Sequence, residues 1–363
     1  MNLSGDGHAQ GLVKDLILQL QGLVKRPMRF MEVCGTHTVS IFRSGLRSII
    51  PEEIELISGP GCPVCVTAQG DIDAFIEVAK RPEVTVATFG DLVRVPGTDG
   101  SLAGRRAIGA DMEVVYSPMD ALQLAVRDRT REIVFLSVGF ETTIPGIAAT
   151  VKEAVRSGTG NFSMLSALKL MPPALNALLG TGGLGIDGLI CPGHVSAIIG
   201  AAAYRPIADG FGMPCVVAGF EPAEILLALI LLARQVNECR AEVENAYPCV
   251  VSWDGNSRAM GVMNDVFCPC DAEWRGLGVI RQSGLCLRPE YSGLDARIRF
   301  GIEIRPSPEP EGCLCGDVIR GLSLPSNCPF FGSKCTPASP VGPCMVSSEG
   351  TCAAYYRYET GVK

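Results

Sequence analysis

Short runs of β-forming residues alternate with helical stretches along most of this chain. Eight such runs lie at residues 28–33, 54–57, 84–89, 113–116, 133–138, 162–166, 189–191 and 215–218. The stretches between and after them, such as DIDAFIEVAK (71–80) and MDALQLAVRD (119–128), carry apolar residues at helical spacing. Strands that alternate with helices build βαβ units and sheets of mostly parallel strands. The sequence therefore predicts an α/β fold.

The eight strands fall into two series whose ends are similar in sequence. VVYSPMDALQLA (114–125) in the first series resembles VVAGFEPAEILLA (216–228) in the second. We therefore predict two similar α/β domains with parallel sheets, at residues 26–130 and 131–244. Residues 1–25 are expected to form an N-terminal helix that packs on a third domain.

The conspicuous motifs of the chain all follow predicted strands. They are CGTH (34–37), GPGCPVC (59–65), FGDLVRVPG (89–97), GFETT (139–143), CPGHVS (191–196) and AGFEP (218–222). In open parallel sheets, ligands bind beyond the carboxyl ends of the strands. We therefore expect these loops to form one functional rim.

Cys62 and Cys65 form a C-x-x-C pair in a Gly/Pro-rich turn that leads into a predicted helix near Gln69. Near a helix N-terminus, unpaired backbone N–H groups stabilise a thiolate, and its pKa falls to roughly 3.5–7.5 in such settings. The spacing favours a redox-active dithiol. Half of a metal site is the second interpretation, and a structural turn with two incidental thiols is the third.

Cys34 and His37 lie at the end of the first predicted strand. A soft thiolate and a borderline imidazole suit iron, copper or zinc. A free cysteine is also often only a small buried hydrophobe. The place of Cys34 on the same rim as Cys62 and Cys65 favours a functional role.

Other polar residues of the rim remain ambiguous from sequence. His194 is expected to be a helix-capping or hydrogen-bonded structural histidine. Asp91, Glu141 and Glu221 could be acids, bases or salt-bridge partners, and their spacing does not choose between these roles.

The C-terminal residues 245–363 are expected to form an irregular domain built around its cysteines, because strand–helix alternation fades there and few apolar side chains remain to be buried. Six cysteines cluster near the end: Cys313, Cys315, Cys328, Cys335, Cys344 and Cys352. One tetrahedral site needs only four ligands, and the spacing matches neither paired zinc knuckles nor the compact ferredoxin run. Four of these thiols could hold a [4Fe-4S] cluster and leave a pair; zinc is the alternative.

Seven cysteines lie outside these motifs or cannot be assigned to chemistry. Cys191, Cys215, Cys239 and Cys249 lie in or beside apolar runs and are expected to be core residues. Cys268, Cys270 and Cys286 receive no role from the sequence.

Charge and hydropathy narrow the possible partners. The net charge is −7 with a pI of about 5.2, and no Lys/Arg-rich run is present, which argues against nucleic acid. The longest apolar run, Ile225–Ala233, is shorter than the ~20 residues that span a bilayer, so no membrane partner is expected. No signal-peptide pattern is found, and we expect a cytoplasmic protein. Stable disulfides are rare in that compartment, whereas metal-binding and catalytic thiols are common.

Eight runs of residues point to a known family. In order they are MEVCGTHT, ISGPGCPVCVT, FGDLVRVPG, GFETT, CPGHVSAIIG, AGFEPAEIL, EWRGLG and CMVSSEGTCAAYY, from about residue 28 to the C-terminus. Together they resemble the HypD family of maturation factors for [NiFe] hydrogenases. The chain departs from the family in Gly278–Arg281, where members usually read GVIP, and in the extra Cys268.

The resemblance implies two α/β domains and a cysteine-rich third domain with a [4Fe-4S] cluster. The family's motif C-x12-C-x6-C-x16-C falls on Cys315, Cys328, Cys335 and Cys352. Cys313 and Cys344 would then be the extra pair.

The resemblance also implies a role in assembling an Fe(CN)2CO unit. Cys34 would ligate the iron together with the N-terminal cysteine of a small HypC-type partner, with His37 close by. Cyano groups would arrive from a HypE-type partner that carries a thiocyanate. Cys62 and Cys65 would be the redox pair that passes electrons from the cluster.

On this resemblance the chain is an assembly factor with redox activity rather than a conventional enzyme. Two other functions remain open from the residues themselves. One is an iron–sulfur disulfide reductase in which Cys62 and Cys65 reduce a protein disulfide. The other is a zinc-stabilised binding module without redox chemistry.

Overall fold

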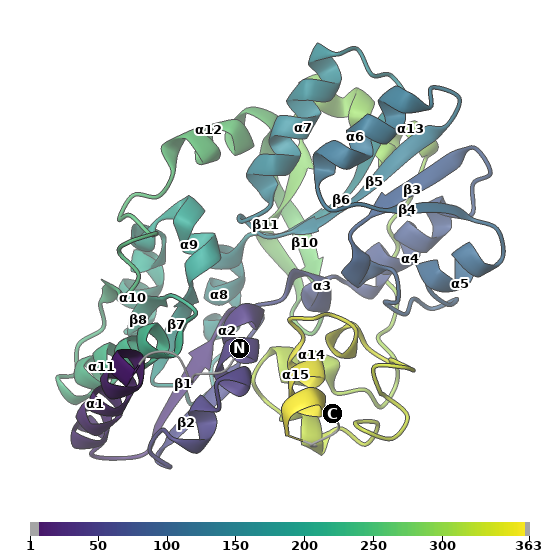
Figure 1. The fold of residues 1–363 in the computed structure, drawn as a ribbon. Helices are drawn as coiled ribbons and strands as arrows, with labels where there is room; N and C mark the ends of the chain where they lie inside the picture. The colour runs from purple at the N-terminus through teal and green to yellow at the C-terminus, as the bar shows by residue number, and fades with distance from the viewer. Residues whose placement is uncertain (1–6, 360–363) are drawn as a thin grey trace.

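Two parallel sheets form the framework of the protein (Figure 1). A computed structural model describes residues 7–359 of the 363-residue chain. The five-stranded sheet has the order β2 (Ile54–Ser58), β1 (Met28–Glu32), β7 (Gly188–Pro192), β8 (Cys215–Ala218), β9 (Val243–Asn245). The four-stranded sheet has the order β4 (Asp111–Val114), β3 (Val84–Thr88), β5 (Glu132–Gly139), β6 (Phe162–Leu168). All neighbouring strands in both sheets are parallel, which confirms the predicted α/β class.

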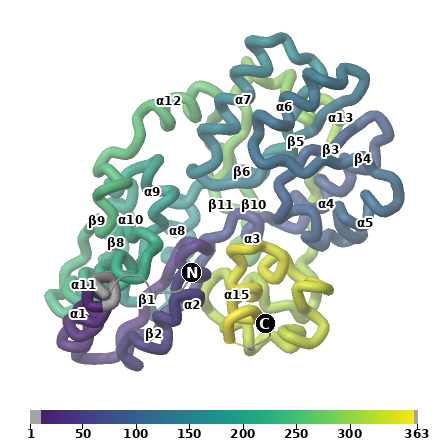
Figure 2. The backbone as a smooth tube through the Cα atoms, viewed as in Figure 1, coloured from purple at the N-terminus to yellow at the C-terminus, as the bar shows by residue number. Residues whose placement is uncertain are grey.

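Each of the eight predicted strands is present, but their grouping differs from the predicted series. β1 and β2 share a sheet with β7 and β8, whereas β3 and β4 pair with β5 and β6. The chain leaves the five-stranded sheet after β2, completes the four-stranded sheet and returns at β7; Figure 2 traces the two crossings through α3 (Pro63–Val66) and α8 (Met171–Gly180). A division at residue 130 therefore does not follow the sheets. Buried parallel strands look alike in sequence, so periodicity finds them without showing which strands pair.

Helices cover both faces of the five-stranded sheet. They are α1 (Gly7–Leu23), α2 (Gly35–Arg43), α9 (Gly193–Ile199), α10 (Arg205–Phe211) and α11 (Pro222–Asn237), together with α8. Buried residues such as Leu20, Ile41 and Leu229 join α1, α2 and α11 on one face. We expected the N-terminal helix on the third domain, but α1 packs against α11 instead, because both helices bury apolar side chains in this same cluster.

The four-stranded sheet also has helices on its two faces. They are α4 (Gln69–Val78), α5 (Leu102–Ala107), α6 (Pro118–Arg127) and α7 (Ile144–Arg156), and α12 (Ser257–Val266) packs on α7. A capping box begins α6: Asp120 N donates to Ser117 Oγ (3.2 Å), and Ser117 N donates to Asp120 Oδ2 (2.9 Å). None of the helices within residues 7–359 is long and apolar enough to cross a membrane.

A two-stranded antiparallel ribbon, β10 (Phe267–Trp274) and β11 (Gly278–Leu287), lies between the two sheets in Figure 1. At its tip, Trp274 stacks on Phe140 with 5.8 Å between ring centroids and donates to Ser283 Oγ (2.8 Å). The sequence analysis did not predict this ribbon, because its strands contain Pro, Gly, Asp and Cys without clear alternation.

Residues 309–359, here called the tail, lie beside α2 and α3 in Figure 1. After α13 (Ala296–Phe300), its regular helices are α14 (Cys315–Ile319) and α15 (Thr351–Tyr358). α15 packs on α2 through Tyr355 and Phe42, whose rings are 4.8 Å apart, with the Arg47 guanidinium over both rings. Short 3-10 helices complete the described chain at Leu46–Ser48, Gly90–Leu92, Ala201–Tyr204, Pro289–Leu294, Pro325–Asn327 and Pro343–Met345.

Candidate functional site

A cavity of about 290 Å³ lies where the carboxyl ends of strands from both sheets meet. Cys34 lines it after β1, Asp91 after β3, Phe140 after β5 and His194 after β7, and Glu349 reaches it from the tail. The expected rim is therefore present for most of the motif loops. The AGFEP loop is the exception, because none of its residues lines this cavity.

Cys34 stands at the wall of the cavity, directly before α2, and is 7% exposed. Burial, followed by the charge of Glu349, raises the pKa of its thiol to about 12, and the backbone N–H groups of His37 and Thr36 act in the opposite direction. The thiol is therefore protonated at neutral pH. A bound metal cation would displace that proton, because the thiolate is the metal ligand.

The Gly59-Pro60-Gly61 turn lies against the end of β1. Gly35 N donates to Gly61 O (3.1 Å), and a Cβ on Gly61 would overlap the backbone nitrogen of Cys34. A Cβ on Gly59 would lie 2.7 Å from the Met31 sulfur. Glycine is required at position 61 so that the two loops that carry the thiols can touch, whereas at position 59 the flexible Met31 side chain would have to shift.

Cys62 and Cys65 are adjacent, buried thiols behind this turn. Cys65 N donates to Cys62 Sγ (3.2 Å), so Cys62 caps α3, and the Cys62 thiol donates to Ser347 Oγ (3.3 Å). Burial, with hydrogen bonds to Cys344 and Cys62, raises the pKa of the Cys65 thiol. Both thiols of the pair therefore contact the tail, Cys62 at Ser347 and Cys65 at Cys344.

Residues 344–349, here called the 344–349 loop, contact every thiol motif of the rim. Cys344 is within hydrogen-bonding reach of Cys65, and Ser347 accepts from Cys62. Glu349 Oε1 accepts from Thr36 Oγ1 (2.6 Å), beside Cys34. Sequence reasoning gave this loop no role of its own, because its contacts are long-range and its residues have no periodic pattern.

Asp91 fixes the 344–349 loop in place. Its Oδ2 atom accepts from Ser347 Oγ (3.1 Å), Ser348 N (3.2 Å) and Ser348 Oγ (3.1 Å). One rim carboxylate thus connects the four-stranded sheet to the tail at the edge of the cavity.

The two rim histidines share one aromatic partner. The His194 ring stacks on Phe220 with 4.1 Å between ring centroids, and the His37 ring lies tilted against Phe220 at 4.7 Å. His37 Nε2 lies 2.9 Å from Gly219 O and 3.3 Å from Ala218 O, so it carries the proton and donates. Burial lowers the pKa of His37 to about 4, which makes it neutral at pH 7, and within the described residues its Nδ1 has no hydrogen-bond partner.

His37 therefore lies behind Cys34 and does not line the cavity, whereas His194 does. Instead of the expected capping or hydrogen-bonding role, His194 has a stacking contact with Phe220 and a place at the cavity wall.

Glu141 and Glu221 have separate structural contacts. Glu141 is buried, accepts from Met171 N (2.9 Å) through Oε1, and burial raises its pKa to about 7. Its Oε2 atom has no partner in the part of the chain that the structure describes. Glu221 forms a capping box with Glu224 at the start of α11.

The six tail thiols surround one small cavity, whose other walls are mostly apolar. The cysteines are Cys313, Cys315, Cys328, Cys335, Cys344 and Cys352. Hydrogen bonds with the thiols of Cys315, Cys352 and Cys65 hold the pKa of Cys344 well below its usual value. Backbone N–H groups also donate to two of these sulfurs, from Val341 to Cys335 and from Cys352 to Cys344, both at 3.3 Å.

An all-thiol set in apolar surroundings, with N–H donors to sulfur, suits an iron–sulfur cluster. Within residues 7–359, no three His, Cys, Asp or Glu side chains converge on a point where one metal ion could bind. The thiols of a cluster bind separate irons, so they stand further apart than the ligands of a single ion.

The remaining cysteines divide between core and surface. Cys191 and Cys215 are buried as predicted. The prediction for Cys239 and Cys249 is wrong, since both are exposed. Cys239 follows α11 with a positive φ of 52°, so the turn directs it out of the apolar stripe that precedes it.

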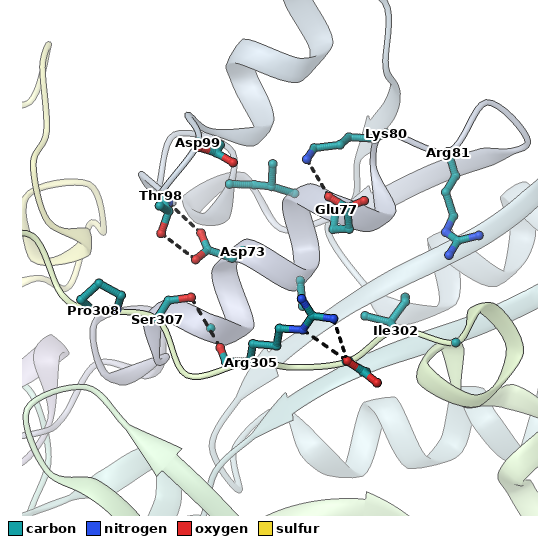
Figure 3. Close-up of a pocket in the computed structure, with 15 residues that line it drawn as sticks. Asp73, Glu77, Lys80, Arg81, Thr98, Asp99, Ile302, Arg305, Ser307 and Pro308 are labelled. Atoms are coloured by element: carbon teal, nitrogen blue, oxygen red, sulfur yellow. Dashed lines mark hydrogen bonds and ion pairs between the residues drawn. The ribbon is translucent and has the colours of Figure 1, made fainter.

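A larger cavity, of about 710 Å³, lies between α4 and residues 301–308 (Figure 3). Several of its charged groups are paired with each other or with nearby polar groups. Asp73 accepts from Thr98 N and Oγ1 (both 2.7 Å), and Lys80 pairs with Glu77 (2.6 Å), as the dashed lines in Figure 3 mark. It contains no thiol and no rim motif, so it is not the candidate site.

Comparison with known proteins agrees with the motifs. The family model HypD, described as the hydrogenase formation hypA family, matches residues 11–359. "Hydrogenase maturation factor HypD" of Escherichia coli K12 is 47% identical over 339 residues, 92% of this chain and 90% of that protein. The Rhodobacter capsulatus protein of the same name is 45% identical over 96% of this chain and 95% of its own length. "Hydrogenase expression/formation protein HupD" of Azotobacter chroococcum is 45% identical over 92% and 90%.

Proposed function

The chain belongs to the HypD family, and we propose that it is a hydrogenase maturation factor that assembles an Fe(CN)2CO unit at Cys34. The iron is the cargo of this reaction. A small HypC-type partner would supply the second thiolate, and a HypE-type partner would bring the cyano groups. The cavity beside Cys34 opens between the sheets, and its volume is at the lower end of small-molecule sites.

One observation carries this proposal: three thiol-bearing parts of the chain meet at one place. Cys34 lies on the cavity wall, the GPG turn touches its backbone, and the Cys62–Cys65 pair follows that turn. The 344–349 loop contacts both thiol motifs from the tail. Such an arrangement suits a cargo metal at Cys34 with a two-electron donor beside it.

The chemistry of cyano transfer explains the need for a dithiol. Release of cyanide from a thiocyanate breaks its S–C bond and requires two electrons and one proton for the leaving thiol. Oxidation of Cys62 and Cys65 to a disulfide supplies two electrons and two protons. One proton goes to the partner's thiol and the other is released as cyanide binds the iron, so atoms and electrons balance. Cys65 N donates to Cys62 Sγ (3.2 Å), so the two ends of this C-x-x-C pair are already held next to each other.

Four of the six tail thiols would hold a [4Fe-4S] cluster, which supplies electrons when bound. The resemblance favours Cys315, Cys328, Cys335 and Cys352. A second set has Cys313 in place of Cys315, because the charges of Cys328 and Cys335 act on Cys313. Contact with Cys344 does not choose between the two sets, since Cys315 and Cys352 are both hydrogen-bonded to it. In that arrangement Cys315 and Cys344 form a second thiol pair, next to Cys65.

Single variants of Cys313 and Cys315, purified without oxygen, separate the two ligand sets. We expect Cys328→Ala to lose the brown cluster absorption and the iron in either case. If Cys313 is a ligand, Cys313→Ala loses both signals and Cys315→Ala retains them. The reverse pattern supports the set given by the resemblance. A colourless protein that contains zinc after strict exclusion of oxygen would contradict both sets.

The proposed function itself is tested in a hydrogenase-producing bacterium whose own HypD gene has been deleted. The parent chain should restore hydrogenase activity. Cys34→Ala and Cys62→Ser should abolish it, because the cargo ligand or the electron donor is missing. Cys249→Ala, which removes an exposed thiol, is the matched control and should keep activity. Full activity of the Cys34→Ala variant would contradict the proposal.

A further inference from the structure

Three cysteines that the proposed function does not use lie on one face of the β10–β11 ribbon. Cys268 is directly opposite Cys286 in the antiparallel register. Cys270 is two residues further along β10, and alternate residues of a strand point to the same face. All three are half-buried, so small molecules in solution can reach them.

Contacts distinguish one pair among these three thiols. The thiols of Cys270 and Cys286 are near enough to each other that each shifts the other's pKa by side-chain hydrogen bonding. The Cys268 thiol instead points to the Cys286 carbonyl oxygen (3.7 Å). In a regular ladder, diagonal neighbours are about 7–8 Å apart. The register shifts between Cys270 and Ala272, so the ladder is irregular beside Cys270. The spacing of a regular ladder therefore does not apply to Cys270 and Cys286.

A cation stands next to this pair. Arg297 Nη2 is 3.8 Å from Cys286 Sγ, and the same nitrogen donates to Asp295 Oδ2 (3.2 Å). A nearby guanidinium stabilises a thiolate, and the thiolate is the nucleophile in thiol–disulfide exchange. Hydrogen bonding from Cys270, together with Arg297, lowers the pKa of Cys286 to about 6, while burial and the charge of Asp295 act in the opposite direction.

We propose that Cys270 and Cys286 form a second dithiol site, which reacts with low-molecular-weight disulfides and closes to a disulfide across β10 and β11. It is separate from the rim and the tail, since none of the three cysteines lines either cavity. The inference goes beyond the proposed function and does not depend on it.

The reaction has two balanced steps. The Cys286 thiolate attacks one sulfur of the disulfide RSSR, which forms a mixed disulfide and releases RS⁻. The Cys270 thiol then loses its proton and attacks the Cys286 sulfur, which forms the Cys270–Cys286 bond and releases the second RS⁻. The Cys270 proton goes to one released thiolate, and the other takes a proton from solvent, equivalent to the one that Cys286 lost on ionising. RSSR is reduced by the two electrons that the cysteines lose.

Peptide mapping after reaction with oxidised glutathione tests this site on the whole protein. Trypsin cleaves after Arg258, Arg275, Arg281 and Arg297, so Cys270 and Cys286 fall on separate peptides, 259–275 and 282–297. After anaerobic reduction, oxidation and alkylation, we expect these two peptides to be linked. Cys286 should also react faster than Cys239 and Cys249, which are more exposed but lack an arginine contact.

Variants decide which thiols are involved. Cys268→Ala should leave the link unchanged, whereas Cys270→Ala should leave glutathione attached to Cys286. Arg297→Gln should slow the reaction of Cys286 at neutral pH by roughly tenfold, because less thiolate is present. A link that survives Cys270→Ala, or Cys286 reacting no faster than Cys239, would overturn the proposal.

Discussion

Cys34 and Glu141 are both buried, and burial favours the protonated form of both side chains. The Cys34 thiol can lose its proton to a metal cation, which replaces one positive charge by another. The Glu141 carboxyl, in contrast, becomes charged near neutral pH while it stays buried, which costs free energy. Burial of Cys34 therefore matters for metal binding, whereas burial of Glu141 makes the stability of the fold depend on pH.

Glu141→Gln should flatten the pH profile of stability. The pKa of Glu141 is about 7 in the folded protein against 4.5 in the unfolded chain, so the folded state holds the extra proton between these values. The free energy of unfolding therefore falls as pH rises from about 4.5 to 7, by about 3 kcal/mol from this group. The glutamine side chain of the variant cannot titrate, and its amide oxygen can still accept from Met171 N. Denaturant midpoints at pH 5, 6, 7 and 8 measure the profile.

Glu113→Gln, at an exposed position on β4, is the control for this profile and should behave like the parent. Equal slopes for the parent and Glu141→Gln between pH 5 and 7 would show that Glu141 does not titrate in this range.

Residue type and place in the chain were enough to identify the thiols as candidates. Cys34, Cys62 and Cys65 follow predicted strands, and they do lie together. The roles of Asp91 and Ser347 could not be predicted, because the two residues are 256 positions apart and their hydrogen bond leaves no local pattern.

At the scale of elements, one turn is shaped by the absence of a side chain. The GPG turn after β2 lies on the backbone of Cys34 because Gly61 has no Cβ. This close approach positions the loop of Cys62 and Cys65 against the loop of Cys34. A small residue was expected in a Gly/Pro turn, but only the structure identifies the atom that it accommodates.

Gly61→Ala should therefore destabilise the protein. The new Cβ would overlap the Cys34 nitrogen and break the bond from Gly35 N to Gly61 O, at a cost of about 1–3 kcal/mol. Gly210→Ala is the matched control, because nothing lies within 4 Å of a Cβ at that position of α10 and alanine favours a helix. Thermal unfolding of both variants decides the matter: equal midpoints would contradict the close packing of the turn.

Strands that alternate regularly with helices were predictable as elements, and β10 and β11 were not. The parallel strands are short apolar runs between turn signals, which periodicity detects. β10 contains Cys268, Pro269 and Cys270, and its stability comes from pairing with β11 and from the burial of Trp274. Tertiary contacts of this kind override local preference.

For the whole molecule, the important fact is that the chain crosses between the sheets twice. The walls of the candidate site therefore come from loops spread over residues 33–195 and from Glu349 in the tail. Sequence order suggested two domains in succession, and the pairing of β1 with β7 could not be read from either strand alone. Periodicity predicted the α/β class, whereas the function was predicted only from the resemblance to a family.

The central claim is that Cys34 holds the iron of an Fe(CN)2CO cargo. Infrared spectroscopy tests it most directly, on the chain purified without oxygen together with its small HypC-type partner. We predict cyanide and carbonyl stretching bands for the parent complex and for Cys239→Ala. In Cys34→Ala these bands should be absent, while the visible absorption of the tail cluster remains. Cyanide and carbonyl bands of parental intensity in Cys34→Ala would contradict the claim.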